Sequence, residues 1–240
     1  MKSIYTSMFI VLSLVTNTKA QETEAMDNQY PGTVLNLDGS RKNVIIETNL
    51  NYPWITQKYI RYFADSLLEG SERVKLRDKP KYDAKDLLGF QVEEKKYEAQ
   101  KYADLSALGP KSVGSYYFLE VAMDGPIKLY RFYDSPPTVM EGDPERIYEE
   151  LRNAPRILIK KGDSKVVAVS SGGLEKMISD CPEVADKYKK GEYGNKVAED
   201  ENAKKKSGLG KLVNKAISMV ATDGYVFEVV TDYNQIMSSH

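Results

Sequence analysis

Cysteine and histidine are almost absent from this 240-residue sequence, which contains one of each, Cys181 and His240. The single histidine is the last residue, which argues against catalytic centres of the Ser-His-Asp and Cys-His types and against zinc sites with histidine ligands. A single cysteine excludes an internal disulfide bond, so folding must depend on the burial of apolar side chains. We interpret Cys181 as a small buried hydrophobe rather than as a thiol that pairs between chains.

The sequence also lacks a basic excess and a recognisable cofactor motif. Lys and Arg number 34 against 35 Asp and Glu, which gives a formal net charge of −1. This balance argues against a general nucleic-acid-binding protein, because such proteins usually carry a basic surface. No phosphate-binding motif or metal-ligand spacing is present, so we predict neither a cofactor nor a bound metal. The apolar fraction of 41% is still sufficient for a real core.

A long apolar run occurs only at the N-terminus. Lys2 precedes apolar residues 4–15, and Thr18 and Ala20 are small residues at the two positions that signal peptidase reads. This pattern predicts a secretory signal peptide over residues 1–20, cleaved after Ala20 and too short to span a membrane as a mature helix. No cysteine follows the run, so we do not expect a lipoprotein. The mature chain is therefore predicted to be periplasmic or secreted, with no transmembrane segment.

Residues 116–134 contain two alternating apolar runs, and we predict a central β-hairpin there. A loop of two or four residues would mix charged and apolar side chains on both faces. The register that we favour has the loop 124–126, with Gly125 supplying a positive φ and Glu120 diagonal to Lys128. It collects five apolar residues on one face, namely Leu119, Val121, Met123, Ile127 and Leu129. The other face carries Phe118, Tyr130 and Phe132, so both faces are expected to be covered.

Alternation predicts further strands on both sides of this hairpin. The expected strands are 33–37, 43–47, 74–76, 88–92, 96–102, 157–159 and 166–169. Residues 51–70 fit either a helix or a strand, and we favour the strand. The fold class that follows is α+β and mainly β: an antiparallel sheet, sandwich or open barrel of about 8 to 10 strands with a short C-terminal helical part.

After Ser170 the apolar spacing changes from two to that of a helix. Helices are expected at 172–180, from Pro182 to Gly191, and at 225–237 with Asp223 as a cap, with a weaker one at 212–220. A short helix over 144–151 would lie in a surface excursion, 135–154. The predicted organisation is a signal peptide (1–20), a disordered lead-in (21–30), an antiparallel β domain (31–170) and C-terminal helices docked on the sheet (171–240) with a charged linker at 192–210.

Three stretches of the sequence carry a resemblance to a known group of proteins. They are residues 32–39 (GTVLNLDG), residues 82–90 (YDAKDLLGF), and residues 180–188 followed later by Tyr233-Asn234. They resemble an uncharacterised family of exported β-rich proteins from Bacteroidota-type bacteria. The resemblance implies a strand before Tyr82 and brings no activity or catalytic residue with it. The insert 192–221 departs from the compact tail of that family.

Two groups of residues are candidate ligand sites. Tyr52, Trp54, Tyr59 and Tyr62 form an aromatic cluster that would suit peptide or glycan recognition if the rings were exposed on one sheet face. The alternative is that these rings face a core and direct only their hydroxyls to its rim. Ser171, Gly172 and Gly173 precede a helix and could hold an anion on free backbone N–H groups, while the alternative is a helix start capped by serine.

Acidic residues offer a weaker candidate. Glu141, Asp143 and Glu145, or Asp83 and Asp86, could bring two carboxylates together for acid-base catalysis or calcium binding. Neither group has the spacing of a known calcium loop, and the alternative is that these acids are solvated.

The function predicted from the sequence is that of an exported cell-envelope or secreted binding module without enzymatic activity. Its partner would be another envelope protein or a surface glycan, bound through the sheet face or through residues 135–154. One alternative is a carboxylate-dependent glycan hydrolase. Another is a structural assembly partner that docks through its C-terminal helix. The sequence does not predict the oligomeric state.

Overall fold

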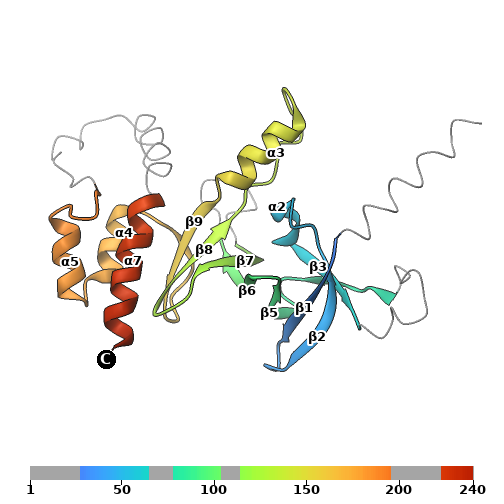
Figure 1. Cartoon of the computed structure of the whole chain (residues 1–240), viewed down its shortest axis with the longest axis horizontal. Helices are drawn as coiled ribbons and strands as arrows, with labels where there is room; N and C mark the ends of the chain where they lie inside the picture. Colours follow the sequence, from blue (N-terminus) through green and yellow to red (C-terminus); the bar gives the residue numbers. More distant parts are fainter. Residues whose placement is uncertain (1–27, 65–77, 104–113, 196–222, 240) are drawn as a thin grey trace, which may run out of the picture.

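The computed structural model describes residues 28–64, 78–103, 114–195 and 223–239. Ten strands in these residues form one antiparallel sheet in the order β10-β9-β8-β7-β6-β5-β1-β2-β3-β4, which confirms the predicted mainly β class (Figure 1). The strands are β1 (Gln29–Asn36), β2 (Arg41–Glu47), β3 (Tyr59–Phe63), β4 (Lys81–Asp83), β5 (Leu87–Val92), β6 (Lys95–Tyr102), β7 (Ser115–Met123), β8 (Ile127–Phe132), β9 (Arg156–Lys161) and β10 (Val167–Ala168). The helices are α2 (Pro53–Thr56), α3 (Pro144–Asn153), α4 (Ser171–Ile178), α5 (Pro182–Lys189) and α7 (Asp223–Ser238).

One face of the sheet, the inner face, closes around a core at the β1–β7 end. Paired residues of antiparallel strands share a face, so the pairs Val34–Phe90, Phe90–Tyr97 and Phe118–Ala99 place these side chains together. This core also receives side chains from β2 and β3, because the twisted sheet curls on itself. The buried residues of this core are Val34, Val44, Ile46, Ile60, Ala84, Leu87, Phe90, Val92, Tyr97 and Phe118.

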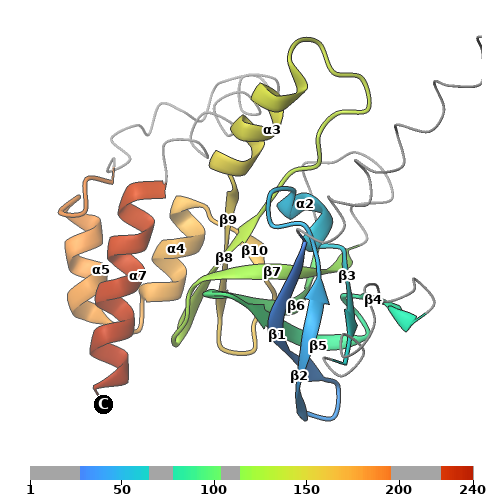
Figure 2. The same ribbon diagram turned by 45° about the vertical axis from the view of Figure 1, so that its right-hand side comes forward.

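The same inner face is covered by helices at the β8–β9 end. Figure 2 shows α4, α5 and α7 side by side next to β8 and β9. Helix α7 buries Val226, Val229, Val230 and Tyr233, which recur at the spacing of one helix face. Cys181 is buried in this core as the predicted small hydrophobe. The predicted docking of the C-terminal helices on the sheet is therefore seen in the structure.

The opposite face, the outer face, has a core of its own centred on β7, β8 and β9. Leu119, Tyr130 and Leu158 are fully buried there, while their sequence neighbour Phe118 is fully buried on the inner face. Both faces of the central hairpin are thus covered, as predicted.

The predicted register of this hairpin is wrong by one position at Val121 and by two at Met123. The loop is 124–126 and Gly125 has φ 148°, as expected, but Glu120 pairs with Arg131 and Val121 with Tyr130. A bulge at Ala122 then shifts the ladder, so Met123 pairs with Leu129. As a result Leu119 and Val121 lie in the outer core, and Met123, Ile127 and Leu129 belong with the helical core. The alternation of apolar residues could not determine the register, because both faces of this hairpin are apolar.

Strand β8 is held at both ends by amide side chains from distant parts of the chain. Gln57 donates to the Tyr133 carbonyl (2.6 Å) and accepts from the Tyr133 N–H (3.0 Å). Asn234 of α7 donates to the Ile127 carbonyl (2.8 Å) and accepts from the Ile127 N–H (2.9 Å). Both amides are buried, so each satisfies two backbone groups that water cannot reach. A side chain at Gly125 would collide with the Asn234 amide.

The remaining elements follow the predictions except for strand β4 and helix α2, which were not expected. Residues 51–64 contain the short helix α2 and then the strand β3, which confirms the strand that we favoured there. Strand β1 already begins at Gln29, so the end of the predicted lead-in belongs to the sheet. The expected strand 74–76, the helix 212–220 and most of the linker 192–210 lie outside the described residues. No helix in the described part of the chain is long and apolar enough to cross a membrane.

We predict that Asn234→Ala lowers the free energy of unfolding by at least about 2 kcal/mol, because the buried N–H and C=O of Ile127 lose their partner. Urea unfolding followed by the fluorescence of the single tryptophan would measure this. Gln235→Ala, an exposed neighbour on the same helix, is the control and should change stability by less than about 0.5 kcal/mol. Equal effects of the two substitutions would contradict the role assigned to Asn234.

Candidate binding groove

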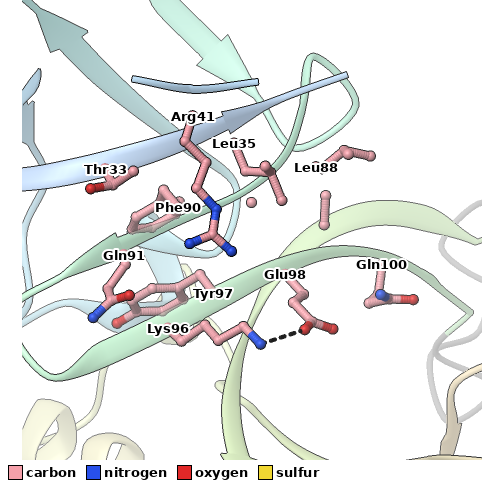
Figure 3. A pocket seen from close by; sticks show the side chains of 12 residues that line it. Thr33, Leu35, Arg41, Leu88, Phe90, Gln91, Lys96, Tyr97, Glu98 and Gln100 are labelled. Atoms are coloured by element: carbon pink, nitrogen blue, oxygen red, sulfur yellow. Dashed lines mark ion pairs between the residues drawn. The ribbon is translucent and has the colours of Figure 1, made fainter. Parts of the chain in front are cut away.

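A groove crosses the outer face where β1, β5 and β6 lie side by side, with β2 contributing at its edge (Figure 3). Its volume is about 380 Å³, within the range of small-ligand sites. The lining residues are Thr33, Leu35, Arg41, Leu88, Gly89, Phe90, Gln91, Lys96, Tyr97, Glu98, Ala99 and Gln100.

The apolar part of the groove is built around Gly89. Gly89 pairs with Leu35 on one side and with Glu98 on the other, in the middle of the sheet. A Cβ atom at this position would collide with the backbone carbonyl of Tyr97, so only glycine fits. Leu35 and Leu88 lie near it, and Leu88 remains 42% exposed although it is a large apolar residue in a strand. The groove therefore offers apolar surface to a ligand.

Beside this apolar part lies a network of four charged side chains. Glu98 accepts hydrogen bonds from Lys128 (2.8 Å) and from the Tyr130 hydroxyl (2.8 Å), and it forms an ion pair with Lys96 (3.1 Å). Asp124 completes the network through ion pairs with Lys96 (2.7 Å) and Lys128 (3.1 Å). Two cations thus balance two carboxylates.

The network also fixes the charge state of Glu98. Burial by itself opposes the charged form, but hydrogen bonds from Lys128, Tyr130 and Lys96 outweigh it and lower the pKa of Glu98 below its ordinary value. The hydrogen bond with Asp124 raises the pKa of Lys96. Both groups therefore stay ionised near neutral pH, and Glu98 is poorly suited to act as a general acid there.

Arg41 is the charged residue of the groove that remains outside this network. Its side chain points into the groove toward β6 (Figure 3), and within the described residues it has no hydrogen-bonding or ion-pair partner. The neighbouring polar residues are uncharged: Thr33, Gln91 and Gln100. Gln100 accepts a hydrogen bond from Lys160 (3.2 Å), which leaves its amide N–H groups for other partners. The groove as a whole therefore combines apolar walls, neutral amides and one surplus positive charge.

A second polar cluster lies on the inner face, between the two cores. Glu120 is buried and accepts hydrogen bonds from Arg131 (2.7 Å) and from the Tyr133 hydroxyl (2.9 Å). The nearby Tyr97 hydroxyl is buried without a hydrogen-bonding partner among the described residues. Burial, followed by the charge of Glu120, raises the pKa of Tyr97 strongly, so this phenol stays neutral. The described cavities do not reach this carboxylate, and it serves to hold β7 and β8 together.

The four aromatic residues predicted as a ligand site do not share one exposed face. Trp54 is only 4% exposed, and its ring contacts Tyr52 and Tyr148 of α3. Tyr62 stacks on Tyr82 with ring centroids 4.2 Å apart, and burial raises its pKa to about 12. These ring contacts pack α3 and β4 against the rest of the sheet.

Tyr59, the fourth of these residues, lines a second cavity of about 240 Å³. The Lys81 ammonium lies over the Tyr59 ring, 4.4 Å from its centroid. The cavity contains one carboxylate, Glu47, which is bound by Lys79 (2.5 Å) and by the Gln29 amide (3.1 Å). Its polar groups are therefore largely satisfied within the chain.

The predicted anion site at the start of α4 has a helix cap in place. The hydroxyl of Ser170 accepts a hydrogen bond from the Gly173 N–H (3.2 Å), and the Ser171 carbonyl accepts one from Tyr188 (3.3 Å). Ser171 and Gly172 are exposed. This arrangement matches the alternative of a serine-capped helix start.

The acidic candidates have local structural roles. Asp143 caps α3 by accepting from the Glu145 N–H (3.2 Å), and Asp86 accepts from the Asp83 N–H (2.9 Å). Among the residues that the structure describes, no three His, Cys, Asp or Glu side chains are grouped as metal ligands would be. A glycan hydrolase of the predicted kind needs two carboxylates about 5–10 Å apart, whereas each of the two cavities contributes one, Glu98 or Glu47.

The residues that line the groove were not identified from the sequence. Alternation along 96–102 does place Lys96, Glu98 and Gln100 on one face, so part of the signal was present. The contribution of Arg41 and Leu35 depends on the pairing of β1 with β5, which are separated in sequence by β2, β3 and β4. That pairing has no local sequence signal.

We predict that Glu98→Gln makes stability less dependent on pH in acid. Because the pKa of folded Glu98 is lowered, its stabilising contribution is present above the unfolded value of 4.5 and is lost as the pH falls through the folded pKa. Urea unfolding at about pH 6 and about pH 3 would show a smaller loss of stability in the variant than in the parent. Glu94→Gln, in the exposed turn between β5 and β6, is the control. An unchanged loss in Glu98→Gln would refute the assignment.

A scan against protein-family models finds no match to this chain. Searches of curated proteins and of solved structures also find no match. The resemblance to exported β-rich proteins therefore stays a prediction from the sequence, and the functional inference depends on the geometry of the groove.

Proposed function

We propose that this protein is a non-enzymatic binding module whose ligand site is the groove on the outer face of β1, β5 and β6. The observation that carries the proposal is the apolar wall of half-buried Leu35 and exposed Leu88 beside Arg41, a positive charge that has no partner among the residues that the structure describes. Isolated exposed leucines are common, but here they line a concave site that also contains convergent polar groups.

The position of the groove on a rigid part of the fold supports this function. Its floor is formed by central strands of the sheet, and beneath it Phe90 and Tyr97 stack with centroids 4.5 Å apart. A site built on paired strands is preorganised, so binding a ligand requires little ordering of the protein. The predicted signal peptide supports a place for this module in the periplasm or outside the cell.

The C-terminal helix is less suited to recruit another chain. The apolar side of α7 is already buried against α5 and the sheet of its own chain, with Val229 and Val230 fully buried. An assembly role through α7 would require this core to open. The groove needs no such rearrangement.

Leu88→Arg tests the proposal, because an arginine at this exposed wall would fill the groove without entering a core. Amide resonances of groove residues would be followed by NMR while a panel of amino acids, disaccharides and short peptides is added. We expect members of one class to shift the resonances of Leu35, Gln91 and Gln100 in the parent protein, and Leu88→Arg to abolish these shifts.

The matched control is Val139→Arg, which adds the same charge at an apolar residue that is 78% exposed and lies outside the groove. It should leave the shifts unchanged. The proposal fails if no member of the panel perturbs the groove, or if the two variants have the same effect.

A further inference from the structure

The charge balance of the groove indicates what kind of ligand it selects. Glu98 and Asp124 are neutralised by Lys96 and Lys128 through contacts of 2.7–3.1 Å. Arg41 is therefore the surplus charge, in a chain whose formal net charge is slightly negative. A ligand with an anionic group at this position gains a charge-assisted hydrogen bond and displaces no existing ion pair.

The guanidinium group of Arg41 suits an oxyanion. Its coplanar N–H groups can form two parallel hydrogen bonds with a carboxylate or a phosphate, and it is more weakly hydrated than an ammonium group. The apolar wall of Leu35 and Leu88 lies on the same side of the groove as Arg41 (Figure 3). The anion must therefore belong to a molecule that also carries an apolar group.

The neutral side chains of the groove suit a peptide backbone. Gln91 and Gln100 present primary amides on the outer face, and each amide can donate and accept in one plane. This chain uses the same pairing internally, where the Gln57 amide satisfies both the N–H and the C=O of Tyr133. The amides of the groove can bind the backbone of an extended ligand in the same way.

A glycan fits these features less well. The aromatic rings among the lining residues belong to Phe90 and Tyr97, which are 3% and 2% exposed and lie in the inner core. The groove thus presents no flat aromatic surface on which a sugar ring could stack. Its volume of about 380 Å³ corresponds to a few residues of an extended chain rather than to a folded surface.

We infer that the groove binds a short acidic peptide segment in extended form. A ligand carboxylate binds the Arg41 guanidinium, and an apolar side chain two residues away, on the same side of the extended chain, contacts Leu35 and Leu88. The amides of Gln91 and Gln100 bind the ligand backbone. This inference rests on the proposed function, since it assigns a ligand class to the same groove.

Fluorescently labelled hexapeptides test the inference by fluorescence anisotropy. The probes carry leucine and then glutamate, glutamine or lysine at every second position, with serine between them, so that these side chains lie on one side of the extended chain. The three probes share apolar content and length and differ in charge. We expect the glutamate peptide to bind the parent protein roughly tenfold more tightly than the glutamine peptide at low salt, and to lose much of this advantage at roughly 0.3 M sodium chloride. The lysine peptide should bind most weakly.

Arg41→Gln should remove the preference for glutamate and leave weak binding to both uncharged and acidic probes. Lys42→Gln is the matched control, because this exposed residue has the same charge on the same strand and points to the opposite face. It should retain the preference. Both residues are exposed, so neither change should affect folding, and thermal melts would verify this.

The inference is overturned if the parent protein binds the glutamate and glutamine peptides equally, or if Arg41→Gln and Lys42→Gln reduce glutamate binding by the same factor. The NMR panel separates this failure from failure of the proposed function. If a sugar or a neutral ligand shifts the groove resonances while the acidic peptide does not, the binding module stands and the ligand class is wrong. If nothing shifts them, both are wrong.

Discussion

The structure depends on how strand β8 is held at its two ends. Gln57, from the turn after α2, forms two hydrogen bonds with Tyr133, and Asn234, from α7, forms two with Ile127. A buried side-chain amide is the smallest group that can replace a neighbouring strand, since it supplies one donor and one acceptor to the same backbone unit. The Gln57 amide connects the curled end of the sheet to strand β8 across 76 residues of sequence. The Asn234 amide connects the C-terminal helices to the same strand across 107 residues.

This arrangement leaves the outer face available for binding. The inner face supports two cores, one closed by the curl of the sheet and one by α4, α5 and α7. Among the described residues, the core of the outer face is centred on β7, β8 and β9, and the neighbouring surface of β1, β5 and β6 carries the groove. The ion pairs around Glu98 lie at the border between the outer core and the groove. They leave Arg41 as the surplus charge without exposing an unbalanced carboxylate.

Local sequence patterns predicted most helices and strands, because the periodicity that marks a helix or a strand is a property of neighbouring residues. Alternation located the strands around Asp38-Gly39 and Gly162-Asp163, and the change to helical spacing after Ser170 located α4 and α5. The hairpin register failed at Ala122, where a bulge redistributes Leu119 and Met123 between two cores. Period-two spacing assigns a face only when the other face is polar, and here both are apolar. The aromatic residues near Trp54 were predicted as one group, yet they pack with partners as distant as Tyr148.

By itself the sequence determined the mainly β class and the helical C-terminal part, because composition and periodicity act residue by residue. Only the tertiary structure decided which side chains meet. The pairing of β1 with β5 places Leu35 and Glu98 on either side of Gly89, with Arg41 beyond Leu35 on β2, and the space around Gly89 becomes a groove only when those strands lie together. A binding site of this kind depends on contacts between segments far apart in the chain, and such contacts leave no mark in the local spacing of residues.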